Sequence, residues 1–407
     1  MISIAEARAL ILAEARPLPP ERRALTDSLG GVLAEPIAAP HHVPPFDNSA
    51  MDGFAVRAVD TAGAGPEHPV ALIMRDTIPA GADSWADVGP GEAAKIMTGA
   101  ALPPGADAVV EVEASEEVGG KVRLFREVVP GTSVRLAGED VAAGDVVLQP
   151  GDPIGPAEIG ILASLGFPEV LVCRRPRVAI ISTGSELVEV DQPLRPGQIR
   201  NSNSYTLEAQ CRQLGLEPDR LGIAPDDYEA TRALVERGLA YDVLITSGGV
   251  SVGEFDFVKD VQDALGVERR LWGVAMKPGK PLAFGVREGC LVFGVPGNPV
   301  AAMVSFELFV RPALMRLMGH RRVLRPTHRA VLEEDVANRY GRVHVMRARA
   351  WREGDVWHAS STGPQGSGIL RSMVKANGLV FIPDDVGVLR AGETADMVLL
   401  REEWLEP

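Results

Sequence analysis

Three polar, glycine-containing loops follow short apolar runs in the middle of the chain. They read STGSEL (182–187), TSGGVSVGEFD (246–256) and VPGNP (295–299). In an open parallel sheet such loops share the carboxyl edge, and each leads into a helix N-terminus with unpaired N–H groups. Glycine lets a ligand approach the backbone closely, and hydroxyl groups add donors and acceptors without adding charge. None of the loops fits a P-loop or a GxGxxG dinucleotide motif, so they indicate a phosphate-bearing or pterin-type ligand.

The loop MKPGKP at 276–281 supplies the positive charge that such a ligand needs. The chain has six lysines, and two of them, Lys277 and Lys280, fall in this loop. Prolines stiffen the loop, and the compact ammonium group of lysine suits a phosphate or an oxyanion. The simpler alternative is a pair of solvated surface lysines.

Several carboxylates flank these loops: Glu186, Asp226, Asp227, Glu254 and Asp256. Their oxygens suit Mg²⁺, which binds one or two carboxylates together with phosphate and water. Each carboxylate alone is also explained as a helix cap, and Asp226 in particular precedes a predicted helix. Together with the lysines, Asp256 and Glu186 are the preferred metal-binding or catalytic candidates.

A second group of polar residues lies nearer the start of the chain. Asp52 precedes a glycine and a short strand in PPFDNSAMDGFAV, and Thr98 lies in the polar turn KIMTGA. Ordinary turn chemistry is the alternative for both residues. The adjacent His41 and His42 are interpreted as surface residues, because neighbouring side chains rarely bind the same ion.

The regions that must position these residues differ in their pattern of apolar residues and in their proline and glycine content. Residues 177–320 alternate apolar runs with helical patterns, which predicts a three-layer α/β domain with a mostly parallel sheet. Residues 41–137 carry short β runs cut by proline and glycine, which predicts a small β-rich domain. This domain is inserted into a helical and extended N-terminal domain formed by 1–40 and 138–176, and residues 321–407 predict a C-terminal β barrel. The fold class is therefore multidomain α/β plus β.

Three helices outside the α/β region are also predicted. They cover residues 4–14, about 21–30 and about 157–165. The first ends before a proline-rich stretch, and the second ends at a glycine.

Composition excludes several classes of protein. The 407 residues carry a net charge of −14, which argues against a general nucleic-acid or acidic-membrane surface. Three widely separated cysteines argue against a zinc cluster and fit a reducing cytoplasm. No apolar run approaches the roughly 18 residues of a membrane span, so a cytoplasmic protein is expected.

Taken together, these segments resemble the molybdopterin molybdenumtransferase family, which includes the C-terminal domain of gephyrin. The resemblance rests on PPFDNSAMDGFAV, KIMTGA, AGEDV, STGSEL, GQIRNSNSYTL, SGGVSVGEFDF, MKPGKPLAFG and PGNPVAAMVSFE, in that order over roughly 44–308, with SSTGPQGSGILRSM beyond them. It implies insertion of molybdenum from molybdate into adenylylated molybdopterin, with Mg²⁺ present and AMP released. It also implies an elongated homodimer with sites shared between subunits, and a molybdopterin adenylyltransferase as upstream partner.

The resemblance assigns roles to residues of this chain. It implies catalytic roles for Asp52, Glu186, Asp226, Asp256 and Lys277, and metal binding by Asp140, Glu186 and Asp256. The residues expected to bind substrate are Thr98, Thr183, Gly184, Ser247, Gly248, Gly249, Ser251, Gly253, Glu254, Lys280, Pro296, Gly297, Asn298, Pro299 and Ser367. One departure is Gly273, which stands where some members carry a further lysine, so the pocket is expected to be less positive there.

Two other functions stay open at this point. One is a non-catalytic molybdopterin-binding or scaffolding protein, since gephyrin clusters receptors. The other is a nucleotide-processing hydrolase that shares only the α/β domain, but it leaves the Asp52 and Thr98 motifs unexplained.

Overall fold

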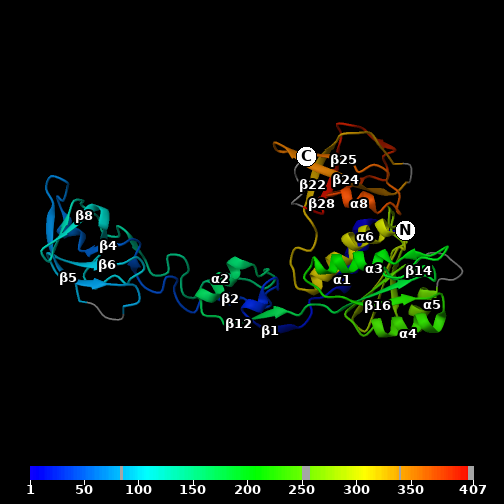
Figure 1. The fold of residues 1–407 in the computed structure, drawn as a ribbon, viewed down its shortest axis with the longest axis horizontal. Helices are drawn as coiled ribbons and strands as arrows, with labels where there is room; N and C mark the ends of the chain where they lie inside the picture. Colours follow the sequence, from blue (N-terminus) through cyan, green and yellow to red (C-terminus); the bar gives the residue numbers. More distant parts are fainter. Residues whose placement is uncertain (83–85, 250–256, 339–340, 402–407) are drawn as a thin grey trace.

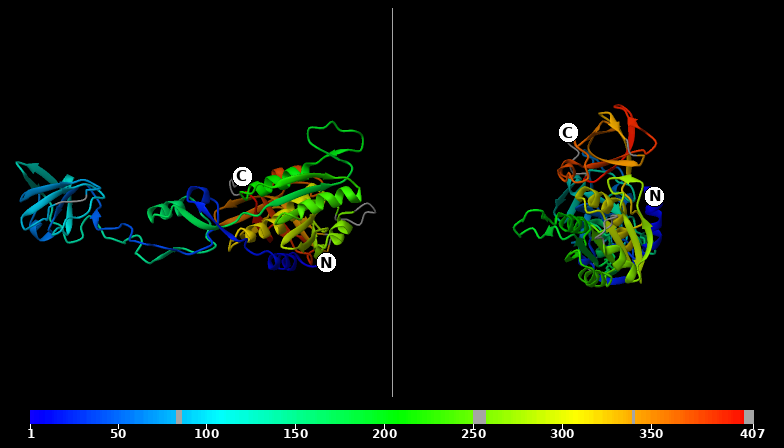
Figure 2. Two further views of the ribbon diagram at one scale, coloured as in Figure 1. Left: turned by 90° about the horizontal axis from the view of Figure 1, so that it is seen from below. Right: turned by 90° about the vertical axis from the view of Figure 1, so that its right-hand side faces the viewer.

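The molecule is elongated, with a β-rich unit at one end and an α/β unit at the other (Figure 1). The computed structural model describes residues 1–82, 86–249, 257–338 and 341–401. Two extended segments connect the β-rich unit to a small unit around helix α2, and this small unit adjoins the α/β unit (Figure 2). None of the described helices is both long enough and apolar enough to cross a membrane.

The β-rich unit is a six-stranded sheet with strand order β7-β4-β6-β5-β9-β8. Its strands are β4 (Gly53–Val56), β5 (Val70–Ile78), β6 (Glu92–Ile96), β7 (Ala108–Glu111), β8 (Ser115–Val118) and β9 (Lys121–Leu124), with 3₁₀ helices η2 (Ala58–Thr61) and η3 (Val112–Ala114) between them. Every residue of β4 is buried, because this strand has a neighbour on each side. A short antiparallel pair, β3 (Asn48–Ser49) with β10 (Val134–Arg135), lies where the chain enters and leaves the unit.

The small unit is built from chain on both sides of the β-rich region. Strand β1 (Pro20–Ala24) pairs antiparallel with β12 (Glu169–Cys173), and β2 (Ile37–Ala38) pairs with β11 (Val146–Leu148). Helix α2 (Pro156–Ser164) confirms the helix predicted near 157–165. Its Leu162 is buried with Leu33 and Val172 in a separate small core.

The helix predicted over 21–30 is wrong. These residues form part of β1 and the 3₁₀ helix η1 (Thr26–Ser28) instead. The residues of β1 find partners in β12, almost 150 positions later, and this long-range pairing outweighs their local helix propensity. Helix α1 (Ile4–Glu14) does have the predicted bounds, and a capping box between Ser3 and Glu6 starts it.

The α/β unit contains a six-stranded sheet with strand order β16-β13-β17-β21-β20-β18. Its strands are β13 (Val178–Thr183), β16 (Asp219–Ala224), β17 (Val243–Ser247), β18 (Glu268–Trp272), β20 (Ala283–Arg287) and β21 (Cys290–Val295), and a short parallel pair, β14 (Leu187–Val188) with β15 (Ile199–Arg200), lies beside them. Strands β16, β13, β17 and β21 are parallel, whereas β20 runs antiparallel to both β21 and β18.

Helices cover both faces of this sheet. They are α3 (Ser202–Arg212), α4 (Tyr228–Gly238), α5 (Phe257–Ala264), α6 (Pro299–Ser305), the π-helical turn η4 (Phe306–Val310) and α7 (Arg311–Leu317). One core joins the sheet to α1, α3, α6, η4 and α7, and a second joins it to α4 and α5. Because both faces are buried, the strands are apolar almost throughout, as the sequence predicted.

The C-terminal region is a closed barrel. Strands β24, β25, β22, β28 and β26 follow one another, and a pairing between β24 and β26 closes the ring. Its elements are β22 (Thr327–Leu332), β23 (Val336–Ala337), β24 (Val343–Glu353), β25 (Val356–Ser361), α8 (Arg371–Lys375), β26 (Gly378–Ile382), β27 (Val388–Leu389) and β28 (Thr394–Leu399). Strand β19 (Met276–Lys277) leaves the α/β unit and pairs with β24, so the lysine loop is fixed to the barrel. The predicted fold class, α/β plus β with a C-terminal barrel, is confirmed.

Candidate active site

A cavity of about 290 Å³ lies at the carboxyl ends of β13 and β17. Its walls come from the loop after β13, the β14–β15 pair, the start of α3, the end of β17 and the loop before α6. The lining residues are Ser182, Thr183, Glu186, Leu187, Ile199, Arg200, Asn201, Ser202, Asn203, Ser247, Gly297, Pro299 and Gly368. The cavity therefore brings together the predicted loops at 182–187 and 295–299. Strand β17, which leads into the third predicted loop, ends at the same cavity.

Asn203 joins two of the loops at the base of the cavity. Its buried amide nitrogen donates to the Ser247 hydroxyl and to the Gly297 carbonyl, at 2.8 Å in each case. Nearby, the Ser182 hydroxyl donates to Asn201 Oδ1 at 2.8 Å, and Asn201 caps α3 by accepting from Ser204 N–H. This network contains only neutral groups, so it shapes the wall without adding charge.

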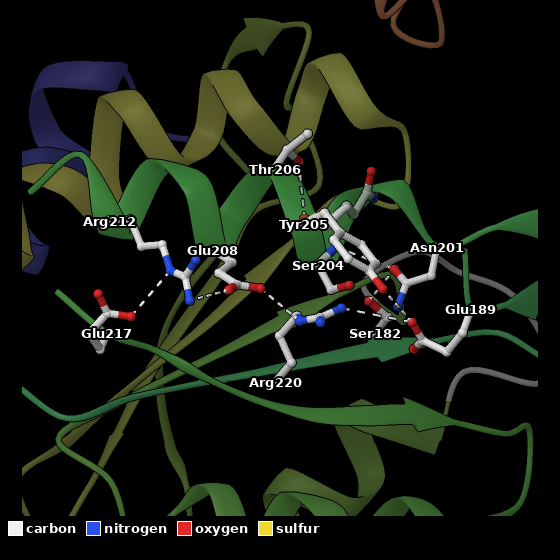
Figure 3. Close-up of polar contacts among 11 residues, drawn as sticks. Ser182, Glu189, Asn201, Ser204, Tyr205, Thr206, Glu208, Arg212, Glu217 and Arg220 are labelled. Atoms are coloured by element: carbon white, nitrogen blue, oxygen red, sulfur yellow. Dashed lines mark hydrogen bonds and ion pairs between the residues drawn. The ribbon is translucent and has the colours of Figure 1, made fainter. Parts of the chain in front are cut away.

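A network of charged side chains and Tyr205 fixes α3 to its neighbours (Figure 3). Arg220 of β16 pairs with Glu208 at 2.7 Å, and its guanidinium lies 3.9 Å from the centroid of the Tyr205 ring. The Tyr205 hydroxyl donates to Glu189 at 3.1 Å. These contacts tie the first turns of α3 to β16 and to the segment after β14. The start of α3 is thereby positioned from two sides.

Glycine is required at two positions beside the cavity. Gly248 has a φ of +90°, and a Cβ there would lie 2.8 Å from the Thr183 carbonyl oxygen and 2.6 Å from its hydroxyl. Gly184 has a φ of +139°, and a Cβ there would meet the carboxylate of Glu186. Side chains at these positions are strained by the backbone and obstructed by neighbours. Gly249 also has a positive φ, of +65°.

The predicted carboxylates of the α/β unit take different roles. Glu186 is exposed on the cavity wall. Asp226 does not cap α4, contrary to one interpretation of the sequence, because Asp227 accepts from Ala230 N–H and is the cap. Asp226 instead accepts from Ser185 N–H at 3.2 Å, while the Ser185 hydroxyl accepts from Asp226 N–H at 3.0 Å. Asp226 is thus bound to the loop that carries Glu186.

The lysine loop lies against the barrel and the end of α6, where a Cβ added at Gly279 would lie 3.0 Å from the Ser305 hydroxyl. Lys277 is partly buried, whereas Lys280 is exposed, and neither lies among the described walls of the cavity. Lys277 pairs in register with His344 of β24. Burial, Arg347 and Lys277 together lower the pKa of His344 to about 4. The lysine charge therefore faces an imidazole that stays neutral at pH 7.

The barrel contributes a loop of its own to the cavity. The Ser367 carbonyl accepts from Val300 N–H at 3.1 Å, at the start of α6, and Gly368 lines the wall. Arg347 holds this loop, since its Nε donates to the Ser372 hydroxyl at 3.1 Å and its Nη2 donates to the Gly366 carbonyl at 3.0 Å. The barrel loop is therefore bonded to the start of α6, directly after the Pro296–Pro299 segment, in which Pro296 is buried and Gly297 and Asn298 are exposed.

Asp52 and Thr98 form a second polar site in the β-rich unit. The Thr98 N–H and hydroxyl both donate to Asp52 Oδ1, each at 2.7 Å. These two bonds, the backbone one first, hold the pKa of Asp52 below its usual range. Both residues are exposed, and they lie next to β4 and β6, at the opposite end of the molecule from β16 and α4 (Figure 1). One chain therefore does not bring this pair to the cavity.

The remaining predicted residues do not gather around Glu186 in one chain. Asp140 is exposed, and its N–H donates to the Val43 carbonyl in the extended link between the β-rich and small units. Ser251, Gly253, Glu254 and Asp256 lie outside the described residues.

Two residues were missed by the sequence interpretation. Asn203 lies in the chain between the first predicted loop, 182–187, and the second, 246–256, and Arg347 lies inside a barrel strand. The GQIRNSNSYTL motif was noted for its resemblance and contains Asn203, so it offered a signal for that residue. Arg347 has no local signal, because only the tertiary fold brings it to the 362–372 loop.

Comparisons with known proteins agree across the whole chain. Residues 2–166 match the family model described as MoeA N-terminal region (domain I and II), residues 179–316 match a probable molybdopterin binding domain, and residues 329–400 match MoeA C-terminal region (domain IV). The chain is similar to the molybdopterin molybdenumtransferase 2 of Mycobacterium tuberculosis (strain ATCC 25618 / H37Rv), with 41% identity over 96% of this chain and 98% of that protein.

Further relatives extend the comparison. The molybdopterin molybdenumtransferase of Bacillus subtilis (strain 168) is 40% identical over 93% of this chain and 90% of that protein. Among solved structures, a molybdopterin biosynthesis moeA protein from Pyrococcus horikoshii OT3 superimposes with a TM-score of 0.83 and 32% identity, over 98% of this chain and 100% of that one.

Proposed function

The chain belongs to the molybdopterin molybdenumtransferase family, and we propose that it inserts molybdenum from molybdate into adenylylated molybdopterin and releases AMP, with Mg²⁺ bound at the cavity. Transfer of molybdenum in molybdenum cofactor biosynthesis is the activity named for its relatives. The adenylylated form of the substrate, the AMP and the Mg²⁺ are the finer part of the proposal.

The observation that carries the proposal is the convergence of loops at one cavity. Hydroxyls, backbone groups of glycine loops and the first residues of α3 line a space of about 290 Å³. Such donors recognise anionic and heteroaromatic groups without a large local charge. In a chain with net charge −14, they offer an anion a local attraction that the overall charge does not.

The carboxylates present fit Mg²⁺ in their chemistry. Glu186 is exposed on the cavity wall, and Asp226 is tied to the same loop through Ser185, so the donors are all oxygen. No group of three or more metal-ligating side chains occurs within the described ranges. Glu186 and Asp256, with Asp140 of a second subunit, would then hold the ion while phosphate and water complete its shell, and Asp226 would fix the loop that carries Glu186. The ion would offset the negative charge of the phosphate groups.

The other residues bind and orient the substrates in this proposal. Ser247, held by Asn203, and Thr183 offer hydroxyls to the ligand, and the barrel loop at Gly368 limits access of water. Lys277 attracts molybdate or phosphate as a point charge. Asp52 stays ionised through its bonds from Thr98, and it acts from the β-rich unit.

We further propose a homodimer in which each site takes Asp52, Thr98 and Asp140 from one subunit and the cavity from the other. The separation of these residues in one chain supports this arrangement. Two exposed apolar residues beside Asp52 also support a contact there: Met51 precedes it, and Val112 N–H donates to its carbonyl. The four-part division at 1–40 with 138–176, 41–137, 177–320 and 321–407, the cytoplasmic location and the adenylyltransferase partner belong to the same proposal.

The direct test supplies purified protein with adenylylated molybdopterin, molybdate and Mg²⁺. We expect stoichiometric AMP release together with molybdenum bound to the dithiolene, and neither without the metal ion. Tight binding of the ligand without AMP release would instead favour a scaffolding protein.

A further inference from the structure

We propose that Trp272, with Lys259 beside it, forms the subsite for the adenine base of the nucleotide part of the substrate. This inference rests on the proposed function, because only an adenylylated substrate carries a purine. It adds an aromatic residue to a site so far built from hydroxyls, carboxylates and lysines.

Strand register places Trp272 at the ligand edge of the sheet. Trp272 is opposite Ala283, Ala283 is opposite Gly294, and Gly294 is opposite Thr246. Strand β18 is antiparallel to β20, which is antiparallel to β21, so β18 ends at the same edge as β17 and β21. Trp272 is therefore level with the residue before Ser247, a residue of the cavity wall.

The distance along this edge suits a nucleotide-bearing ligand. Three strand spacings separate β17 from β18, which is about 14 Å. Adenylylated molybdopterin carries the pterin and the adenine at opposite ends of a phosphate linkage, and the two ends need well-separated sites. Along the carboxyl edge of the sheet, the cavity offers a polar subsite and Trp272 offers an aromatic one.

The surroundings of Trp272 are cationic. Its side chain is 40% exposed, and Lys259 Nζ of α5 lies 5.8 Å from the ring centroid. Arg269 Cζ lies 5.4 Å from the same centroid, and this guanidinium also pairs with Asp263. Next along the chain, Gly273 N–H donates to the Leu282 carbonyl and Val274 N–H donates to the Lys280 carbonyl, so the lysine loop is bonded to the backbone directly after Trp272.

This combination matches the chemistry of a nucleotide. An exposed aromatic ring stacks on any base, and ammonium groups near it attract the phosphate. Of the three tryptophans in the described part of the chain, only Trp272 is among the exposed large residues, whereas Trp351 and Trp357 of the barrel are partly buried. An exposed tryptophan beside a lysine and an arginine is unusual on a surface with excess negative charge.

The test compares binding of AMP and of ribose 5-phosphate, which lacks the base, by calorimetry and tryptophan fluorescence. We expect Trp272→Ala to weaken AMP binding about tenfold, as loss of one base stack should, and to leave ribose 5-phosphate binding unchanged. Trp272→Phe should keep most of the affinity. AMP should quench the fluorescence of wild type and of the matched control Trp351→Phe, and much less that of either Trp272 variant.

Three results would overturn the inference: unchanged AMP affinity in Trp272→Ala, equal losses for AMP and ribose 5-phosphate, or no AMP binding by wild type. The insertion assay separates this failure from that of the proposed function. If wild type and Trp272→Ala insert molybdenum with the same KM for adenylylated molybdopterin, only the adenine subsite is wrong. If wild type inserts no molybdenum and releases no AMP, the function itself is wrong.

Discussion

Lys277 lies on β19, which pairs with β24 of the barrel, and we propose that its ammonium group reaches the substrate. If its ammonium group contacts molybdate or phosphate, Lys277→Ala should weaken binding by about 1.5–3 kcal/mol, the usual range for a hydrogen bond to a charged group. Lys121→Ala, on an exposed strand end of the β-rich unit, is the matched control and should bind as wild type does. Calorimetric titration with molybdate and with the adenylylated substrate measures both. Equal affinities would remove Lys277 from the site.

Asn203 should contribute to both stability and substrate binding, because its side-chain amide donates hydrogen bonds to two loops of the cavity. In Asn203→Ala the Ser247 hydroxyl and the Gly297 carbonyl lose a buried donor, which typically costs about 1–3 kcal/mol. We expect a lower Tm and a higher KM for the molybdopterin substrate. Gln213→Ala, at the exposed end of the same helix, should change neither. A variant with normal KM would mean that the loops keep their positions without this residue.

For single residues, the sequence predicted which residue types lie in the loops better than it predicted their hydrogen-bond partners. Thr183, Ser247 and the glycines follow from loops at strand ends, because the carboxyl edge of a parallel sheet collects such residues. The cap of α4 was harder to assign, because Asp226 and Asp227 are adjacent. Only the structure shows which of the two side chains accepts a hydrogen bond from the first turn of the helix. Arg347 could not be found from the sequence, since its partners lie about 20 residues away in a loop folded by the barrel.

Among the elements, β19 joins the lysine loop to the barrel by pairing with β24. His344 of β24 makes the stability of the folded protein depend on pH. The folded-state pKa of His344 is about 4, against 6.5 for the ordinary group, mainly because of burial. Between these values the unfolded chain binds a proton that the folded chain does not, so stability falls as pH drops from 6.5 to about 4. The full difference is about 3 kcal/mol.

His344→Gln should therefore reduce the loss of Tm between pH 6.5 and pH 4. The slope will not vanish, because burial also lowers the pKa of His320, which responds in the same direction. The exposed His68→Gln is the control and should keep the wild-type slope. Thermal unfolding at half-unit pH steps gives both slopes. Identical slopes for wild type and His344→Gln would contradict this assignment.

Elements defined by local pattern were predicted well, and elements defined by distant partners were not. The bounds of α1 follow from its capping box and the prolines after it. Strand β1 was mistaken for part of a helix because its five residues are stabilised by β12, which the local sequence does not reveal. Strand β19 is two residues long and exists only through β24.

The elongated shape of the molecule separates its two groups of candidate site residues. Its β-rich unit and its α/β unit, which holds the cavity, lie at opposite ends (Figure 1). We therefore expect the Asp52–Thr98 pair and Glu186 to act on one substrate from different subunits. The sequence placed these residues in different domains, but it could not show that the link between them is extended. A homodimer with shared sites would bring the two groups of residues together.

The most direct test mixes Asp52→Ala subunits with Glu186→Gln subunits and measures molybdenum insertion. In a shared site each heterodimer has one site with both residues intact and one with neither, so random pairing should leave about a quarter of all sites active. Homodimers of each variant alone set the background, and two affinity tags confirm that heterodimers form. Activity near a quarter of wild type is the expected result. Activity no higher than the background, with heterodimers present, would contradict the shared site.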